Sequence, residues 1–124
     1  IWACNSISTN LHHWPFVLEA QKRGAKVVVI DSYRSRTAKA ADWHICPKPG
    51  TDGALAMGFI HSIIAQGLVD QEWVDKYTYG YPELKYRSAE FTPEYVEKVT
   101  GVKADDIRKF AKEFATAQPS VIRL

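Results

Sequence analysis

The sequence has few cysteines, no long apolar run and almost no net charge. Its two cysteines, Cys4 and Cys46, are too few for a disulfide framework and lack the CxxC spacing of common metal and redox motifs. No stretch approaches the roughly eighteen consecutive apolar residues of a membrane-spanning helix, so no membrane span is predicted. The formal net charge is only +2, and we expect no nucleic-acid partner.

What remains is the composition of an ordinary globular protein. Of the 124 residues, 46% are hydrophobic and 24% are charged, which suits one compact domain spanning residues 1–124. The first residues lack an initiator methionine and resemble the middle of a strand, so we expect a fragment of a longer protein. Basic residues outnumber acidic ones in residues 1–50, an imbalance that a phosphate site would use.

Strand-like and helix-like patterns alternate in the first half of the chain. The β-branched run within Lys26–Asp31 predicts a strand buried on both faces, as in a parallel sheet. Shorter strands are predicted at residues 1–4 and 43–47. Between the first two strands we expect a helix that ends near Gly24 and turns Trp14, Val17 and Leu18 inward. Between the second and third strands we expect a loop over 32–42. The second half is predicted to be helical over 54–67, 71–79, 92–99 and 104–117. The fold class is therefore α/β, with a mostly parallel sheet of adjacent strands and a helical C-terminal half.

Three loops follow the predicted strands, at the edge of the sheet where open α/β folds bind ligands. In chain order they are Ala3–Thr9, Asp31–Arg36 and Pro49–Asp52. The first offers backbone N–H groups, Asn5 and Ser6 to an anion. The second places Asp31 where nucleotide-binding folds hold ribose hydroxyls, with a following arginine for phosphate. In the third, Thr51 is expected to cap the next helix while the Asp52 carboxylate accepts the paired N–H donors of guanine. Each of these side chains is also a common turn or cap residue, and that alternative stays open.

The first loop lacks the common glycine signatures of nucleotide sites. A dinucleotide fingerprint requires GxGxxG, and the P-loop has its own glycine pattern, whereas Ala3–Ser8 contains no glycine. The loops therefore favour a nucleotide bound in another way.

Four segments together resemble the molybdopterin oxidoreductases, the group of dimethyl sulfoxide reductase, nitrate reductases and formate dehydrogenases. These segments are Ile1-Trp2-Ala3-Cys4-Asn5, Arg23-Gly24-Ala25-Lys26-Val27-Val28-Val29-Ile30-Asp31, Arg36-Thr37-Ala38 with Ala41-Asp42, and Pro49-Gly50-Thr51-Asp52-Gly53-Ala54-Leu55. The resemblance covers essentially the whole chain. It departs from the family pattern at Ala3, which replaces the usual glycine, and at Ser32-Tyr33, which replaces Pro-Arg.

The resemblance implies a Rossmann-like three-layer domain that helps to bind one of two molybdopterin guanine dinucleotides. It implies that Ala3, Cys4, Asn5 and Ser6 lie along the phosphate and pterin-proximal part of the ligand. It implies that Asp31, Ser32 and Arg34 meet the guanosine ribose and phosphates, and that Gly50, Thr51 and Asp52 hold the guanine. Cys4 and Cys46 are expected to be small buried residues at strand ends rather than ligands of a metal.

The function implied by the resemblance is that of a molybdenum-dependent enzyme catalysing two-electron redox or oxygen-atom transfer. The implied 4Fe-4S cluster and the molybdenum ligand lie outside this chain, so no catalytic residue and no metal ligand is expected here. The implied partners are the remaining domains of the parent enzyme and an electron-transfer subunit, and the isolated chain is expected to be inactive. The compartment stays open between the cytoplasm and the periplasm of a prokaryote.

Two alternatives stay open from the residues. One is a Rossmann-like domain that binds NAD or another nucleotide in a dehydrogenase or transferase. The other is an interaction module without a ligand.

Overall fold

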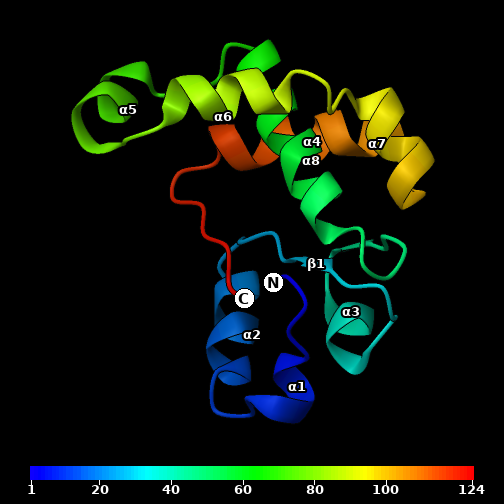
Figure 1. Cartoon of the computed structure of the whole chain (residues 1–124). Coiled ribbons are helices and arrows are strands. Elements are labelled where there is room, and N and C mark those ends of the chain that lie inside the picture. Colours follow the sequence, from blue (N-terminus) through cyan, green and yellow to red (C-terminus); the bar gives the residue numbers. More distant parts are fainter. The chain divides into compact units, whose positions relative to one another are not determined.

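The computed structural model describes all 124 residues, which form two compact units (Figure 1). The first unit contains residues 1–47 together with 121–124, and the second contains residues 48–120. The expected single domain stays a prediction, because compact units need not fold independently. None of the helices combines the length and the apolar character that crossing a membrane requires.

The first unit is built on parallel strand pairing. Strand β1 (Val28–Ile30) pairs in parallel with β2 (Trp43–Ile45), so that Ile30 lies opposite Ile45. On the other side of β1, Trp2 forms a parallel bridge with Ile30. The predicted parallel pairing is confirmed, although the strand predicted at residues 1–4 is reduced to the single bridging residue Trp2. Val29, Ile30 and Ile45 are buried, as expected of strands with apolar neighbours on both faces.

Helix α2 (Trp14–Lys22) ends just before Gly24, as the sequence predicted. Gly24 has a φ of +95°, a conformation that glycine adopts without steric penalty. The prediction that Leu18 faces inward is wrong, since Leu18 is 41% exposed. The half-buried positions of this helix are Trp14, Val17, Ala20 and Gln21, which lie along one face. Leu18 lies outside that face, beside Trp14.

The predicted loop over 32–42 contains a short helix, α3 (Arg36–Ala40). Its first turn is capped by the Ser35 hydroxyl, whose oxygen accepts a hydrogen bond from the Ala38 N–H at 3.2 Å. A helix of five residues is too short for apolar periodicity to reveal it in the sequence. A second short helix, α1 (Ser6–Thr9), lies within the first predicted loop and forms its second half.

The second unit is entirely helical. All four helices predicted in this half are present, and the additional helix α6 follows Gly80, whose φ is +81°. The helices are α4 (Asp52–Ala65), α5 (Gln71–Tyr77), α6 (Tyr81–Ser88), α7 (Pro93–Thr100) and α8 (Ala104–Thr116). The fold is thus helix-rich α/β with a small parallel sheet.

The core of the second unit lies where α7 and α8 pack on α4. The aromatic rings of Phe59 and Phe110 join α4 to α8, with ring centroids 4.4 Å apart. Gly58 lets α4 approach α7 closely, because a Cβ atom at this position would lie 2.9 Å from Val96 Cγ2. Val96 and Ile107 are fully buried, so this contact excludes water.

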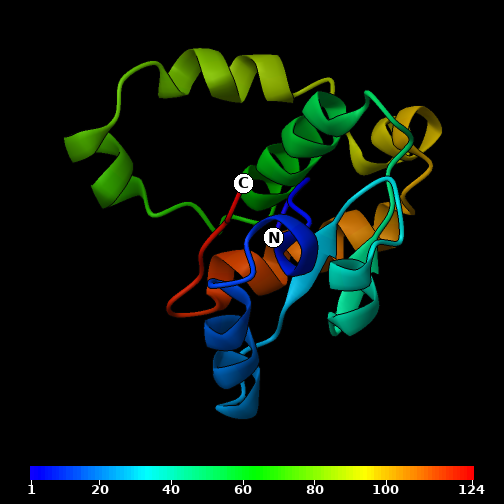
Figure 2. The same cartoon turned by 90° about the horizontal axis from the view of Figure 1, so that it is seen from below.

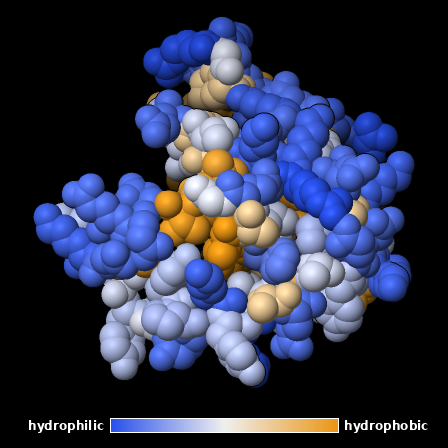
Figure 3. Space-filling view, turned by 90° about the horizontal axis from the view of Figure 1, so that it is seen from above, coloured by the Kyte–Doolittle hydropathy of each residue, from blue (hydrophilic) through white to orange (hydrophobic).

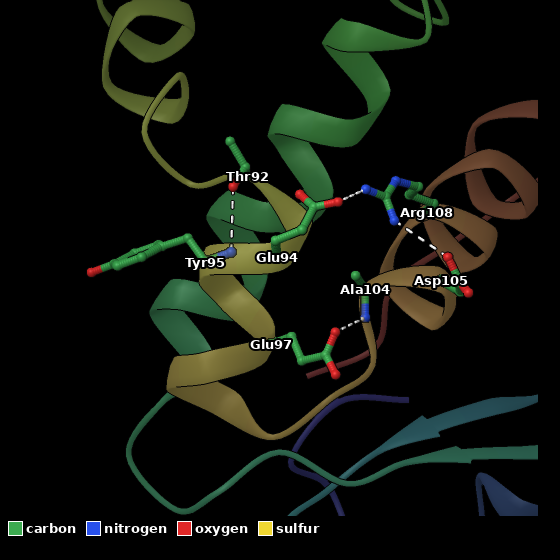
Figure 4. Close-up of polar contacts among 7 residues, drawn as sticks. All are labelled: Thr92, Glu94, Tyr95, Glu97, Ala104, Asp105 and Arg108. Carbon is green, nitrogen blue, oxygen red and sulfur yellow. Dashed lines mark hydrogen bonds and ion pairs between the residues drawn. The ribbon is translucent and has the colours of Figure 1, made fainter.

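Polar contacts join α7 to α8 around this core (Figure 4). Glu97 on α7 accepts a hydrogen bond from the Ala104 N–H at 2.9 Å and thereby caps the start of α8. Arg108 on α8 pairs with Glu94 and, at 3.3 Å, with Asp105. The pKa of Glu94 is lowered by the hydrogen bond from its own backbone N–H and by the one from Arg108. These exposed ion pairs contribute little stability by themselves.

An apolar hollow of about 350 Å³ separates α5 from the rest of the second unit. Figure 3 shows the hydrophobic surface in this hollow, and α5 lies apart from α4, α7 and α8 in Figures 1 and 2. No residue of α5 is buried, which makes this helix the least packed part of the unit. The apolar lining comes mainly from Ile60, Ile63, Ile64, Val69, Val74 and Leu84.

Candidate cofactor-binding loops

The first loop leaves the sheet through a left-handed residue. The Ala3 N–H donates to the Ile30 carbonyl at 2.8 Å, as in a strand, but Ala3 has a φ of +52°. A residue with a Cβ atom adopts this conformation at a cost of roughly 1–2 kcal/mol, whereas glycine adopts it freely. A glycine would adopt this turn without strain, whereas Ala3 adopts it under strain.

The Asn5 side chain ties the first loop to α3. Its Oδ1 accepts a hydrogen bond from the Thr37 hydroxyl at 2.8 Å, and the Thr37 oxygen in turn accepts one from the Ile7 N–H at 3.1 Å. The main chain of Asn5 is held as well, because its carbonyl accepts from the N–H groups of Ser8 and Thr9. Asn5 is half-buried, whereas Thr37 is fully buried. The buried Thr37 side chain therefore holds the loop on the side that faces the protein interior.

The neighbouring Cys4 and Ser6 differ in how much of them a ligand could reach. Cys4 is half-buried, and its sulfur lies 3.6 Å from the Ser6 hydroxyl. Ser6 is fully buried. Ser6 thus supports the loop from inside, while the accessible groups of this segment belong to Ala3, Cys4 and Asn5.

The second loop begins with an Asx-type turn at Asp31. The Asp31 Oδ1 accepts a hydrogen bond from the Tyr33 N–H at 3.1 Å, which holds the carboxylate at the carboxyl end of β1. Asp31 is half-buried, whereas Ser32 and Arg34 are exposed. This loop therefore presents a carboxylate, a hydroxyl and a guanidinium group within four consecutive residues.

His44 in β2 and Cys46, just after this strand, hold the second loop in place. The His44 Nε2 lies 2.8 Å from the Asp31 carbonyl oxygen, and the Cys46 thiol donates to the Ser32 carbonyl at 3.5 Å. Cys46 is exposed, so its predicted burial is wrong. No group of three or more His, Cys, Asp or Glu side chains in this chain is arranged to hold a metal ion.

The third loop belongs to the second unit and leads into α4. Gly50 has a φ of +79°, and the Thr51 N–H donates to the Lys48 carbonyl at 3.2 Å. Thr51 occupies the N-cap position of α4, but its hydroxyl donates to the Lys48 carbonyl at 2.7 Å instead of accepting from the helix. The predicted cap hydrogen bond is therefore wrong, because the tight turn offers Thr51 a nearer acceptor. Asp52 is the first residue of α4 and is half-buried.

The predicted site residues are thus divided between the two units. Those of the first two loops belong to the first unit, where Trp2 pairs with Ile30 just before both loops and the bond between Asn5 and Thr37 joins the first loop to α3. Gly50, Thr51 and Asp52 belong to the second unit. Thr37 was not singled out in the sequence as a functional residue, and only the strand order reveals that it meets Asn5.

The functional groups of the loops match the chemistry of a nucleotide. Amide, hydroxyl and guanidinium groups donate hydrogen bonds to phosphate oxygens, and carboxylates accept them from ribose hydroxyls or from guanine. The donor set contains one guanidinium and no cluster of thiolates or imidazoles. It fits a phosphate-bearing organic ligand better than a bare metal ion.

Comparisons with known proteins agree on one family. A family model described as "Molybdopterin oxidoreductase" matches residues 4–122. The "Probable oxidoreductase YoaE" of Bacillus subtilis (strain 168) is 42% identical over 123 residues, which are 99% of this chain and 18% of that protein. Formate dehydrogenase H of Escherichia coli (strain K12) is 39% identical over 106 residues, which are 86% of this chain and 15% of that protein.

A solved structure shows the same fold. Acetylene hydratase from Pelobacter acetylenicus superposes with a TM-score of 0.86 at 38% identity, over 92% of this chain and 16% of that one. The chain therefore spans less than a fifth of the length of each of these three relatives.

Proposed function

Because the chain belongs to the molybdopterin oxidoreductase family, we propose that it forms part of the molybdopterin guanine dinucleotide site of a molybdenum-dependent oxidoreductase. When bound, that cofactor supplies the two-electron redox or oxygen-atom transfer chemistry, and the protein binds and orients it. In this proposal the chain contributes binding and orientation, and it contributes no catalytic residue.

The observation that carries the proposal is the junction of the first two loops. Both loops follow parallel segments that pair with each other, and the Asn5–Thr37 hydrogen bond joins the first loop to α3, the helix that follows the second loop. In open α/β sheets, ligands bind outside the carboxyl ends of neighbouring strands. The parallel pairing of Trp2 with β1 thus supports a shared ligand at this edge, in keeping with a Rossmann-like arrangement.

The proposed contacts follow the chemistry of each loop. Ala3, Cys4 and Asn5 meet the phosphate and pterin-proximal part of the cofactor, and Ser6 supports them from inside. Asp31 and Ser32 meet the guanosine ribose, while the exposed Arg34 pairs with phosphate. Gly50 provides the left-handed turn that leads to Thr51 and Asp52, and the Asp52 carboxylate accepts from guanine N1–H and N2–H₂.

The remaining parts of the enzyme lie outside this chain in the proposal. The relatives are more than five times longer, which supports additional domains that complete the cofactor site. Those domains would carry the molybdenum ligand and a 4Fe-4S cluster, and an electron-transfer subunit would exchange electrons with them.

Guanine recognition at Asp52 is tested by Asp52→Asn in the complete protein. The substitution keeps the shape but sets an N–H₂ donor against a guanine donor. We expect affinity for guanosine diphosphate to fall by about 1–3 kcal/mol, the cost of an unpaired buried donor. Isothermal titration of the cofactor-free protein with guanosine and adenosine diphosphates measures this loss and the selectivity.

A matched control is Asp105→Asn, which makes the same change in the first turn of α8. If Asp52 acts only as a helix-start carboxylate, both variants will bind guanosine diphosphate as the unsubstituted protein does. Guanine recognition would then have to lie elsewhere.

A further inference from the structure

Thr37 occupies a buried position directly beneath the proposed phosphate-facing loop. Its side chain has no solvent-exposed surface, so it cannot touch a ligand that approaches the loop from outside. Its hydroxyl nevertheless contacts two groups of that loop, the Asn5 Oδ1 at 2.8 Å and the Ile7 N–H at 3.1 Å. Any influence of Thr37 on the ligand must therefore pass through these loop groups, of which only Asn5 offers a side chain that can reach a ligand.

The two hydrogen bonds of the Thr37 hydroxyl determine which way the Asn5 amide faces. The Ile7 N–H occupies a lone pair of the Thr37 oxygen, and the single Thr37 proton is donated to Asn5 Oδ1. With the amide oxygen held toward Thr37, the amide nitrogen is turned away from it. That Nδ2 group donates to no atom of the chain, and it is not among the buried side-chain atoms without a partner. Asn5 thus offers a hydrogen-bond donor at the surface of the loop.

The orientation matters because the two ends of an amide have opposite chemistry. The nitrogen donates a hydrogen bond to a phosphate oxygen, whereas the oxygen would repel it. Without Thr37, a rotation of the amide by half a turn would exchange the two ends at little cost, since they have nearly the same shape. Rotation would reduce the fraction of molecules in which the amide nitrogen faces the ligand, and the apparent affinity would fall with it. Holding the amide in one orientation avoids this loss.

We propose that Thr37 is a positioning residue that holds the Asn5 amide nitrogen toward a phosphate group of the bound nucleotide. The inference rests on the proposed function, in which the first loop meets the phosphates. It adds a specific role to a residue of α3 that does not contact the ligand, and it assigns the contact at Asn5 to the side-chain nitrogen.

The test compares two substitutions at Thr37 in the complete, cofactor-free protein. Thr37→Val keeps the shape and removes both hydrogen bonds, whereas Thr37→Ser keeps the hydroxyl. Titration with guanosine diphosphate is the probe. We expect Thr37→Val to weaken binding about tenfold, in line with the loss of one well-oriented hydrogen bond to a charged group. We expect the affinity of Thr37→Ser to stay within about twofold of that of the unsubstituted protein, because the serine hydroxyl can make the same two hydrogen bonds.

A double-mutant cycle separates positioning from a general structural role. In an Asn5→Ala background the amide is absent, so Thr37→Val should weaken binding no further. Guanosine without phosphates should bind all these variants alike. Equal binding by Thr37→Val and Thr37→Ser, or a full loss from Thr37→Val in the Asn5→Ala background, would overturn the inference.

The same titration distinguishes this inference from the proposed function. If the unsubstituted protein does not bind guanosine diphosphate, the proposed function fails, and the role of Thr37 fails with it. If the unsubstituted protein binds and Thr37→Val changes nothing, only the role of Thr37 fails.

Discussion

At the scale of single residues, Asp42 shows how one carboxylate organises the start of a strand. Its Oδ2 accepts hydrogen bonds from the Val27 N–H at 2.7 Å and from Gln21 Nε2 at 3.1 Å. Its own N–H donates to the Val27 carbonyl at 2.9 Å. Asp42 thus joins the end of α2 to the chain entering β1 and β2. These bonds, above all that from Val27, lower the pKa of Asp42 below its ordinary value.

The lowered pKa of Asp42 makes its contribution to stability pH-dependent. An unfolded aspartate titrates near pH 3.9, and the folded pKa lies below that value. The ionised carboxylate therefore stabilises the fold above about pH 4, and this contribution is lost as the pH falls through the folded pKa. In the ¹⁵N-labelled chain, the Val27 amide shift should titrate with a midpoint below about 3.9.

The Gln21→Ala variant tests the cause of that shift. Removing the Gln21 amide should raise the midpoint toward the ordinary aspartate value, but only in part, because the Val27 N–H remains in place. A midpoint at the ordinary value in the unsubstituted chain would contradict the hydrogen bonds described for Asp42.

At the scale of elements, the close approach of α4 to α7 depends on a residue without a side chain. Gly58 faces the fully buried Val96, and an added Cβ atom would lie 2.9 Å and 3.1 Å from its two methyl carbons. Glycine within a helix is otherwise unfavourable by about 1 kcal/mol relative to alanine. The sequence retains it here because helix packing at this point outweighs helix propensity.

The substitution Gly58→Ala should therefore destabilise α4 and α7. Overpacking costs about 1–3 kcal/mol, which exceeds the gain of about 1 kcal/mol in helix propensity. Hydrogen exchange of the α4 and α7 amides in the complete protein should become faster. In the control Gly53→Ala, also in α4, the new Cβ meets nothing within 4 Å, so the same amides should exchange more slowly. Slower exchange in both variants would disprove the tight packing at Gly58.

At the scale of the whole molecule, the proposed function makes this chain one part of a larger cofactor site. In that proposal, the first unit supplies the phosphate donors and the carboxylate for the ribose, and the second unit supplies the carboxylate for guanine. The chain spans less than a fifth of the length of the relatives described above. The groups that would bind molybdenum itself are not expected in this segment.

The purified 124-residue chain should accordingly be catalytically inactive. A substrate that the complete protein turns over in a redox-dye assay should give no turnover with the chain alone, even with added molybdenum cofactor. The complete protein, assayed in parallel, is the positive control. Measurable turnover by the chain would mean that the reacting centre is held by residues described here.

Local sequence patterns were sufficient to predict most helices, the parallel strands and the family. The β-branched run ending at Ile30 requires burial on both faces, and Pro93 marks the start of a helix through its fixed φ. Gly24 and Gly101 end helices because they adopt left-handed φ values without strain. Each of these signals depends only on a residue and its near neighbours, which is why the sequence alone conveys them.

Only the tertiary structure decided which side chains meet across the fold. Asn5 and Thr37 are 32 positions apart, and the order of Trp2, β1 and β2 brings them within 2.8 Å. Thr51 was expected to accept a helix hydrogen bond, but the turn at Gly50 gives its hydroxyl the nearer Lys48 carbonyl. Such partners depend on strand order, helix placement and loop conformation. Because these features come from packing over the whole unit, residue type and spacing do not contain them.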